Sequence, residues 1–261
     1  MKYLKKSLGQ NFLIDKNIIK KIVSLTNFEN KNIIEIGPGK GILTDEILTK
    51  KPKSLIVIEK DDKLANDLNT KYSYNKIVKV INEDFLKFNL DNIDKKNLII
   101  VGNLPYNISS QILVKILKKV DTHPIYKDII LMFQKELGEK IIAKYPSKHY
   151  GRLSIITSYK LKQVKNFFVS ANCFFPKPKV TSIVIHFKVT NKISFKIKKL
   201  LSLEKITNII FSNKRKMINK NILKILSKKK LEKIPELNLK LRPENIPPEI
   251  YYKITELYEK D

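Results

Sequence analysis

The chain has 261 residues, enough for one large domain or two small ones with a well-buried core. Its 52 Lys and Arg against 25 Asp and Glu give a formal net charge of +27, which predicts a polyanionic partner and favours nucleic acid over a membrane surface. No apolar run approaches the roughly 18 residues that span a membrane, and the first residues lack the apolar stretch of a secretory signal, so we expect a cytoplasmic protein. A single cysteine, Cys173, excludes an internal disulfide, and with three histidines it makes no convincing zinc set, so we expect no metal.

The first notable segment is Ser7-Leu-Gly-Gln-Asn-Phe-Leu-Ile14. It precedes a predicted amphipathic helix that Asp15 is placed to cap, with Ile18, Ile19 and Ile22 on its apolar face. A polar Gly-Gln-Asn between apolar residues indicates either an ordered lid over a ligand or a helix-entry loop. Taken alone, the segment favours the loop.

A glycine loop follows the first predicted strand, residues 32–36. The loop Gly37-Pro38-Gly39-Lys40-Gly41 leads into a predicted helix, and its glycines allow the backbone to approach a nucleotide-type ligand closely. The spacing matches neither the dinucleotide Gly-x-Gly-x-x-Gly pattern nor a phosphate loop, so a pyrophosphate is not strongly indicated. By itself, such a loop is equally a tight turn.

The next two predicted strands, residues 54–58 and about 76–81, each end in acidic side chains. Glu59 lies 20 residues after Gly39, where an acid accepts both hydroxyls of a ribose. Asp84 is placed to accept a hydrogen bond from an adenine amino group, while Phe85 flanks the ring. Considered singly, each acid is as well explained as a solvated residue at a strand end.

The fourth predicted strand, residues 98–101, is followed by Gly102 and the tetrad Asn103-Leu104-Pro105-Tyr106. The Asn103 oxygen and the Leu104 carbonyl, held by Pro105, suit the two N–H groups of an exocyclic amine, and Tyr106 suits stacking on its ring. The alternative is a strand-to-helix turn without chemistry.

Four successive strand ends therefore carry a glycine loop, a Glu, an Asp and the tetrad. Because the carboxyl ends of parallel strands form the ligand crevice of an open α/β sheet, this order predicts a cradle for an adenosine-containing cofactor with a reaction site beside it.

The same residues resemble a known family, the KsgA-type small-subunit ribosomal RNA adenine dimethyltransferases. The resemblance runs from about Leu8 to Phe187. The blocks that carry it are Leu8-Gly-Gln-Asn-Phe-Leu13, Glu35-Ile-Gly-Pro-Gly-Lys-Gly-Ile-Leu-Thr44, Asn103-Leu-Pro-Tyr106, Gln134-Lys-Glu136, Tyr150-Gly-Arg-Leu-Ser154 and Phe174-Phe-Pro-Lys-Pro-Lys-Val-Thr-Ser182.

This resemblance implies a class I S-adenosylmethionine-dependent (Rossmann-like) methyltransferase fold and methyl transfer to N6 of adenine in ribosomal RNA. It implies a cofactor site in which Asn11 and Leu13 come from the lid and Gly37 lies at the methionine part. It also implies that Asn103 lies at the transfer centre and that Phe174 stacks on the target base opposite Tyr106. The full set of cofactor residues expected is Asn11, Leu13, Gly37, Gly39, Glu59, Asp84, Phe85 and Asn103.

A domain boundary is expected at Val189-Thr-Asn-Lys192, which divides the chain into a methyltransferase domain, residues 1–189, and a small basic helical domain, residues 190–261. The second domain carries the run Lys214-Arg215-Lys216, for which we favour contact with RNA phosphates over a merely solvated face.

We expect the partner to be small-subunit ribosomal RNA, in a pre-30S-type particle, and the protein to be a monomer. Two rival functions fit much of the same sequence. One is a large-subunit ribosomal RNA methyltransferase of the antibiotic-resistance type, and the other is an RNA-binding assembly factor without catalysis. Pro38, Leu104 and the block Phe211–Asn219 favour the small-subunit family.

Overall fold

The computed structural model describes residues 10–93, 97–122, 126–190 and 194–260. The chain forms two compact units. The first comprises Met1–Gly138 and Lys162–Val189, and the second comprises Glu139–Leu161 and Thr190–Asp261. Ser7, Leu8 and Gly9 of the predicted N-terminal segment, and Asn191 and Lys192 of the predicted boundary, lie outside the described residues.

The division differs from the predicted one in a single segment. The first unit does end at Val189, but Glu139–Leu161 belongs to the second unit. Hydrogen bonds within that unit explain why: the Tyr150 hydroxyl donates to the Ile246 carbonyl at 2.9 Å, and the Tyr252 hydroxyl donates to the Ile155 carbonyl at 3.0 Å. These contacts span about a hundred positions in the sequence, so no local pattern signals them.

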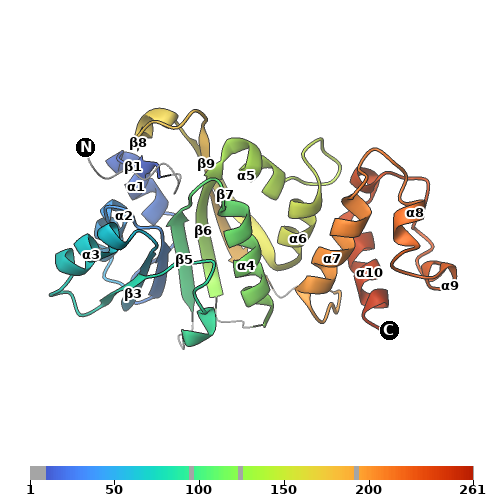
Figure 1. Ribbon diagram of the computed structural model, residues 1–261, viewed down its shortest axis with the longest axis horizontal. Helices are drawn as coiled ribbons and strands as arrows, with labels where there is room; N and C mark the ends of the chain where they lie inside the picture. Colours follow the sequence, from blue (N-terminus) through green and yellow to red (C-terminus); the bar gives the residue numbers. More distant parts are fainter. Residues whose placement is uncertain (1–9, 94–96, 123–125, 191–193, 261) are drawn as a thin grey trace. The chain divides into compact units, whose positions relative to one another are not determined.

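A seven-stranded sheet of order β4-β3-β2-β5-β6-β9-β7 organises the first unit (Figure 1). Its strands are β2 (Asn32–Ile36), β3 (Ser54–Glu59), β4 (Val78–Asn82), β5 (Leu98–Asn103), β6 (Tyr126–Gln134), β7 (Leu161–Val169) and β9 (Ser182–Val189). Strands β4, β3, β2, β5 and β6 are parallel, and β9 runs antiparallel to β6. The four predicted strands are thus present, and β5 extends through Asn103, two residues beyond the predicted end.

The sheet is built outward from its centre. The chain runs from β2 to β3 and β4 on one side, then returns to β5 and β6 on the other, so the strand order reverses between β2 and β5. Both strands are apolar and buried, as expected for parallel strands covered on both faces. Gly102 allows their close approach, because a Cβ there would lie 2.8 Å from the Ile36 carbonyl oxygen. In open α/β sheets, a reversal of this kind marks the ligand crevice.

Helix α1 (Lys16–Val23) precedes the first strand of this sheet. Between its strands lie α2 (Ile42–Leu48), α3 (Asp62–Lys71), the 3-10 turn η2 (Leu90–Asn92), α4 (Ser109–Thr122) and α5 (Lys135–Ile141), whose last residues belong to the second unit. The predicted cap of α1 is confirmed, since the Asp15 side chain accepts hydrogen bonds from the backbone N–H groups of Asn17 and Ile18. Ile19, Ile22 and Val23 form its buried face.

A second, two-stranded sheet joins β1 (Phe12–Leu13) to β8 (Phe174–Phe175), which follows the 3-10 turn η3 (Ala171–Cys173). The pairing is antiparallel, with Phe12 opposite Phe175 and Leu13 opposite Phe174. It brings the N-terminal segment against a block more than 150 residues away. The sequence predicted neither strand.

The second unit is helical, with α6 (Arg152–Lys160), α7 (Leu200–Phe211), α8 (Asn219–Ile222), α9 (Lys228–Leu231), the 3-10 turn η4 (Pro243–Asn245) and α10 (Pro248–Tyr258). Tyr251 on α10 is fully buried, stacks on Phe211 at 5.7 Å and donates its hydroxyl to the Pro243 carbonyl at 2.7 Å. None of the helices in the described part of the chain is long and apolar enough to cross a membrane.

Candidate active site

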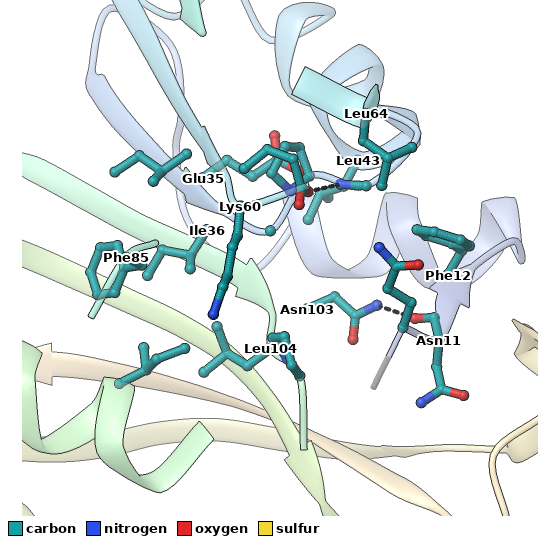
Figure 2. Close-up of a pocket in the computed structure, with 18 of the residues that line it drawn as sticks. Asn11, Phe12, Glu35, Ile36, Leu43, Lys60, Leu64, Phe85, Asn103 and Leu104 are labelled. Carbon is teal, nitrogen blue, oxygen red and sulfur yellow. Dashed lines mark hydrogen bonds between the residues drawn. The ribbon is translucent and has the colours of Figure 1, made fainter. Parts of the chain in front are cut away.

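A cavity opens at the carboxyl ends of β2, β3, β4 and β5, where the strand order reverses (Figure 2). The predicted cofactor residues and the tetrad all lie on its wall: Asn11, Leu13, Gly37, Gly39, Glu59, Asp84, Phe85, Asn103, Leu104, Pro105 and Tyr106. Residues that are far apart in the sequence therefore meet around one cavity, as the strand-end argument predicted.

The glycine loop after β2 requires its glycines. Gly37, Gly39 and Gly41 have φ values of +64°, +59° and +76°, a left-handed region that side chains rarely adopt. A Cβ on Gly39 would lie 2.7 Å from the ring of Phe12. The loop thus presents bare backbone to the cavity, and β1 packs directly over it.

Glu59, at the end of β3, is only 7% exposed, and burial raises the pKa of its carboxyl group. Its Oε2 accepts the Gly39 N–H at 3.1 Å, and its Oε1 accepts the Asp61 N–H at 2.9 Å. Each carboxylate oxygen has two lone pairs, so each can still accept a second donor such as a ribose hydroxyl.

Asp84 and Phe85 follow β4. The Asp84 carboxylate accepts hydrogen bonds from Lys60 Nζ at 2.8 Å and from the Leu86 N–H at 2.9 Å. Burial alone would raise the pKa of Asp84, but these two hydrogen bonds, together with the positive charges of Lys60 and Lys87, lower the pKa, so the group is anionic at neutral pH. Phe85 is buried and gives the cavity a flat apolar wall (Figure 2).

Asn103 ends β5 with its side chain directed at the N-terminal segment (Figure 2). Its Nδ2 donates to the Asn11 carbonyl at 2.9 Å, which identifies the opposite atom, Oδ1, as the free acceptor of the amide. Among the described residues, no donor engages Oδ1. The turn beyond it is closed by the Ile108 N–H, which donates to the Pro105 carbonyl at 3.2 Å.

Tyr106 is half-buried, and a hydrogen bond of 2.6 Å joins its hydroxyl to Ser182 Oγ on β9. The tetrad is therefore tied both to the N-terminal segment, through Asn103, and to the antiparallel strand β9, through Tyr106.

The structure does not bring Phe174 to this cavity. Its side chain is 3% exposed and belongs to the hydrophobic core that also contains Leu13 and Val169. Because side chains alternate along a strand, the β1–β8 register places Phe174 on the core side with its partner Leu13, which also touches the cavity. Phe175 lies on the opposite side with Phe12 and is 39% exposed. The expectation that Phe174 stacks on a target base is thus corrected.

The cavity wall also contains residues that were not predicted as site residues, among them Phe12 and Lys60. Phe12 covers Gly39, and Lys60 pairs with Asp84. Lys60 could have been predicted from the sequence, because it directly follows Glu59. Phe12 could not, because its place on the wall depends on strand β1, which was not predicted. Lys214, Arg215 and Lys216 lie in the second unit, in an exposed turn between α7 and α8.

These residues fit S-adenosylmethionine. The glycine loop leaves room for the amino-acid part, Glu59 offers two acceptors to the ribose, and Asp84 with Phe85 suits an adenine. Together with the mixed sheet and its reversal between β2 and β5, they define a class I S-adenosylmethionine-dependent methyltransferase.

The chain belongs to the ribosomal RNA adenine dimethylase family, whose model matches residues 1–260, and it is therefore an enzyme that uses S-adenosylmethionine. A ribosomal RNA small subunit methyltransferase A of Pelagibacter ubique is 44% identical, covering 98% of this chain and 97% of that protein. The protein of the same name in Mycoplasma mobile is 40% identical, covering 95% of each.

Solved structures support the fold. A dimethyladenosine transferase from Plasmodium falciparum matches with a TM-score of 0.75 at 24% identity, covering 95% of this chain and 98% of that one. The 23S rRNA methyltransferase ErmE matches with a TM-score of 0.71 at 23% identity, covering 95% and 99%.

Proposed function

We propose that this enzyme transfers two methyl groups to N6 of adenine in small-subunit ribosomal RNA, with Asn103 positioning the amino group. The observation that carries the proposal is that Asn103 lines the cavity with its Nδ2 bound to the Asn11 carbonyl, which leaves Oδ1 as an acceptor. An acceptor oriented in this way suits the N–H of an incoming exocyclic amine.

The cofactor supplies an activated methyl group bound to a sulfonium. Gly37 and Gly39 let the backbone approach its amino-acid part, Glu59 accepts from the ribose, and Asp84 with Phe85 receives the adenine. Asn11 and Leu13 cover the cofactor from the N-terminal side.

The adenine amino group is a weak nucleophile because its lone pair is delocalised into the ring, so alignment is the main requirement for transfer. Hydrogen bonds from its two N–H groups to Asn103 Oδ1 and the Leu104 carbonyl favour a pyramidal nitrogen with its lone pair directed at the methyl carbon. Pro105 holds the turn, and the Tyr106 ring stacks on a base that has left its helix. No general base is required.

A second transfer needs no further residue. Each methylated nitrogen releases a proton to solvent, and after the first transfer it keeps one hydrogen. One of the two acceptors then orients that N–H, and the pocket must accommodate the first methyl group. The substrate we propose is a pre-30S-type particle in the cytoplasm, approached by a monomeric enzyme whose charge of +27 suits RNA. The small-subunit assignment rests on relatives such as those of Pelagibacter ubique and Mycoplasma mobile, which carry that function in their names.

The substitution Asn103→Ala tests this proposal. It removes the acceptor but keeps Leu104 and Pro105, so single-turnover methylation of small-subunit particles should fall by at least about tenfold, or about 1.4 kcal/mol of barrier. Particle binding should change little, because docking depends on the basic surface. Transfer is measured with labelled cofactor and mass spectrometry of the nucleosides, which also reports N6,N6-dimethyladenosine directly.

Asn166→Ala is the matched control, since Asn166 is exposed on β7 and lines no part of the cavity. It should methylate at the unsubstituted rate. Near-normal methyl transfer by Asn103→Ala would show that Asn103 does not position the amino group. Methyl transfer only to large-subunit RNA would contradict the proposed small-subunit substrate.

A further inference from the structure

One lysine binds three backbone carbonyls of the loop that follows β4. Lys115, on α4, donates hydrogen bonds from Nζ to the backbone carbonyls of Phe85 at 2.7 Å, Leu86 at 2.8 Å and Phe88 at 2.6 Å. An ammonium group has three N–H donors, and all three are accounted for by this loop.

The loop needs such a donor because of its shape. The N–H groups of Lys87 and Phe88 both donate to the Asp84 carbonyl, at 2.8 and 2.9 Å, which closes one tight turn. The carbonyls of Phe85, Leu86 and Phe88 follow in that turn, and Lys115 satisfies them as a side chain satisfies the last carbonyls of a helix.

The contact is partly buried. Phe85 and Phe88 are buried, and the Lys115 ammonium lies 5.4 Å from the centre of the Phe85 ring. Burial lowers the pKa of Lys115, while the negative charges of Glu83 and Asp84 oppose that shift and favour the charged form. Removing this ammonium would leave three carbonyls without the donor they now have, and each such loss is costly in a partly buried setting.

Helix α4 contacts both the cavity and the loop after β4. Ile108 and Ile112 line the cavity, and Lys115 lies three residues after Ile112 on the same helical face. One turn further along, Lys119 pairs with Asp91, at the other end of the same loop. This face of α4 therefore contacts the loop at both ends.

We propose that Lys115 is a positioning residue for the adenine end of the cofactor site: by holding the turn that begins at Asp84, it keeps the Asp84 carboxylate and the Phe85 ring in place before the cofactor binds. The inference rests on the function proposed above, because it assigns the adenine to Asp84 and Phe85. Lys115 itself does not touch the cofactor.

The consequence is a population effect. If the turn forms only part of the time, the apparent affinity for any adenosine ligand is the intrinsic affinity multiplied by the fraction of molecules in which the turn is formed. The amino-acid end of the cofactor and the RNA contacts are unaffected.

Lys115→Met is the decisive variant, since it keeps a long unbranched side chain and removes all three donors. Calorimetry with S-adenosylhomocysteine should show a dissociation constant at least about tenfold higher. 5′-Methylthioadenosine, which lacks the amino-acid end, should lose affinity by the same factor. Lys79→Met, on the exposed side of β4, is the matched control and should bind both ligands normally.

Kinetics separate positioning from a purely structural role. With Lys115→Met, the KM for S-adenosylmethionine should rise at least about tenfold while kcat at saturating cofactor and the KM for RNA stay within about twofold. Lower thermal stability with an unchanged KM for the cofactor would overturn the proposal. So would an affinity loss confined to S-adenosylhomocysteine.

Amide hydrogen exchange adds a test that needs no activity. In the unsubstituted protein without ligand, the amides of Lys87 and Phe88 should already be protected, and Lys115→Met should release them. Unprotected amides in the unsubstituted protein would refute a preformed turn even if the variant fails to fold. Failure of the unsubstituted protein to bind S-adenosylhomocysteine would instead refute the proposed function.

Discussion

Glu35, a single buried residue near the site, makes the stability of the protein depend on pH. It precedes the glycine loop on β2, is 1% exposed, and accepts a hydrogen bond from Thr44 Oγ1 at 2.7 Å. Burial raises the pKa of its carboxyl group from 4.5 to about 8, an effect that the hydrogen bond from Thr44 only partly offsets. The folded protein therefore keeps a proton on Glu35 at neutral pH.

The pH dependence follows from that proton. Between the ordinary pKa of 4.5 and the raised value of about 8, the folded state binds a proton that the unfolded state has released, so the free energy of unfolding falls as pH rises through this window. Between about pH 6 and about pH 9, the loss attributable to Glu35 should be about 2–3 kcal/mol. Glu35→Gln, which is neutral at every pH, should lack it.

Urea unfolding of the two proteins at both pH values measures this difference, and other titrating groups cancel in the comparison. Parallel pH profiles for the unsubstituted protein and Glu35→Gln would contradict a buried, protonated Glu35.

At the scale of elements, the loop after β5 is positioned by strands that it does not belong to. Asn103 is bound to the segment that enters β1, and the Tyr106 hydroxyl is bound to Ser182, which is fully buried on β9. Burial raises the pKa of Tyr106, so the hydroxyl stays protonated. The hydrogen bond thus orients the ring, and the ring is the part that we expect to stack on the target base.

Tyr106→Ala should therefore lower the single-turnover methylation rate by more than about tenfold. Tyr106→Phe keeps the stacking face and loses one neutral hydrogen bond of about 1 kcal/mol, so it should lower the rate only a fewfold. Ser182→Ala should behave like Tyr106→Phe, and the double variant should be no worse than either one, because both remove the same bond.

Rates from single-turnover assays on these variants decide this point. If Tyr106→Phe lowered the methylation rate as much as Tyr106→Ala, the hydroxyl and not the ring face would be required for transfer.

At the scale of the whole molecule, the excess of basic side chains is the dominant feature. Lys214, Arg215 and Lys216 are all exposed in one turn of the second unit, beside Met217, which is 51% exposed. Basic side chains concentrated in this way gain affinity for RNA by releasing counterions from phosphates. This part of the chain is our candidate for RNA docking.

Replacing Lys214, Arg215 and Lys216 together with Gln should weaken binding to small-subunit RNA. The slope of log affinity against log salt should also become shallower, by roughly 0.7–0.9 for each phosphate that the variant no longer neutralises. Affinity for S-adenosylhomocysteine should not change. Filter binding or fluorescence anisotropy over a salt series measures the slope.

Three other exposed lysines form the control: Lys51 and Lys53, before β3, and Lys76, before β4, at the amino ends of the strands and therefore away from the cavity. Their replacement with Gln should change RNA binding less. Equal effects of the two triple variants would mean that only net charge matters.

The sequence by itself determined which strand-end residues meet at the cavity. Strand patterns, the glycine loop, Glu59, Asp84 and the tetrad are local signals, and in a parallel sheet every strand end lies at the same edge, so knowing the strands was enough to bring these residues together. The capped helix after Asp15 and the helical second unit were predicted for the same reason.

Tertiary structure alone decided the features that depend on pairing between distant segments. The register of β1 against β8 places Phe174 in the core, and a one-residue shift would have placed it on the outer face. Long-range hydrogen bonds bring residues 139–161 into the second unit, and the three carbonyls bound by Lys115 lie 27 to 30 positions before it. Such contacts depend on the packing of whole elements, which no local periodicity encodes.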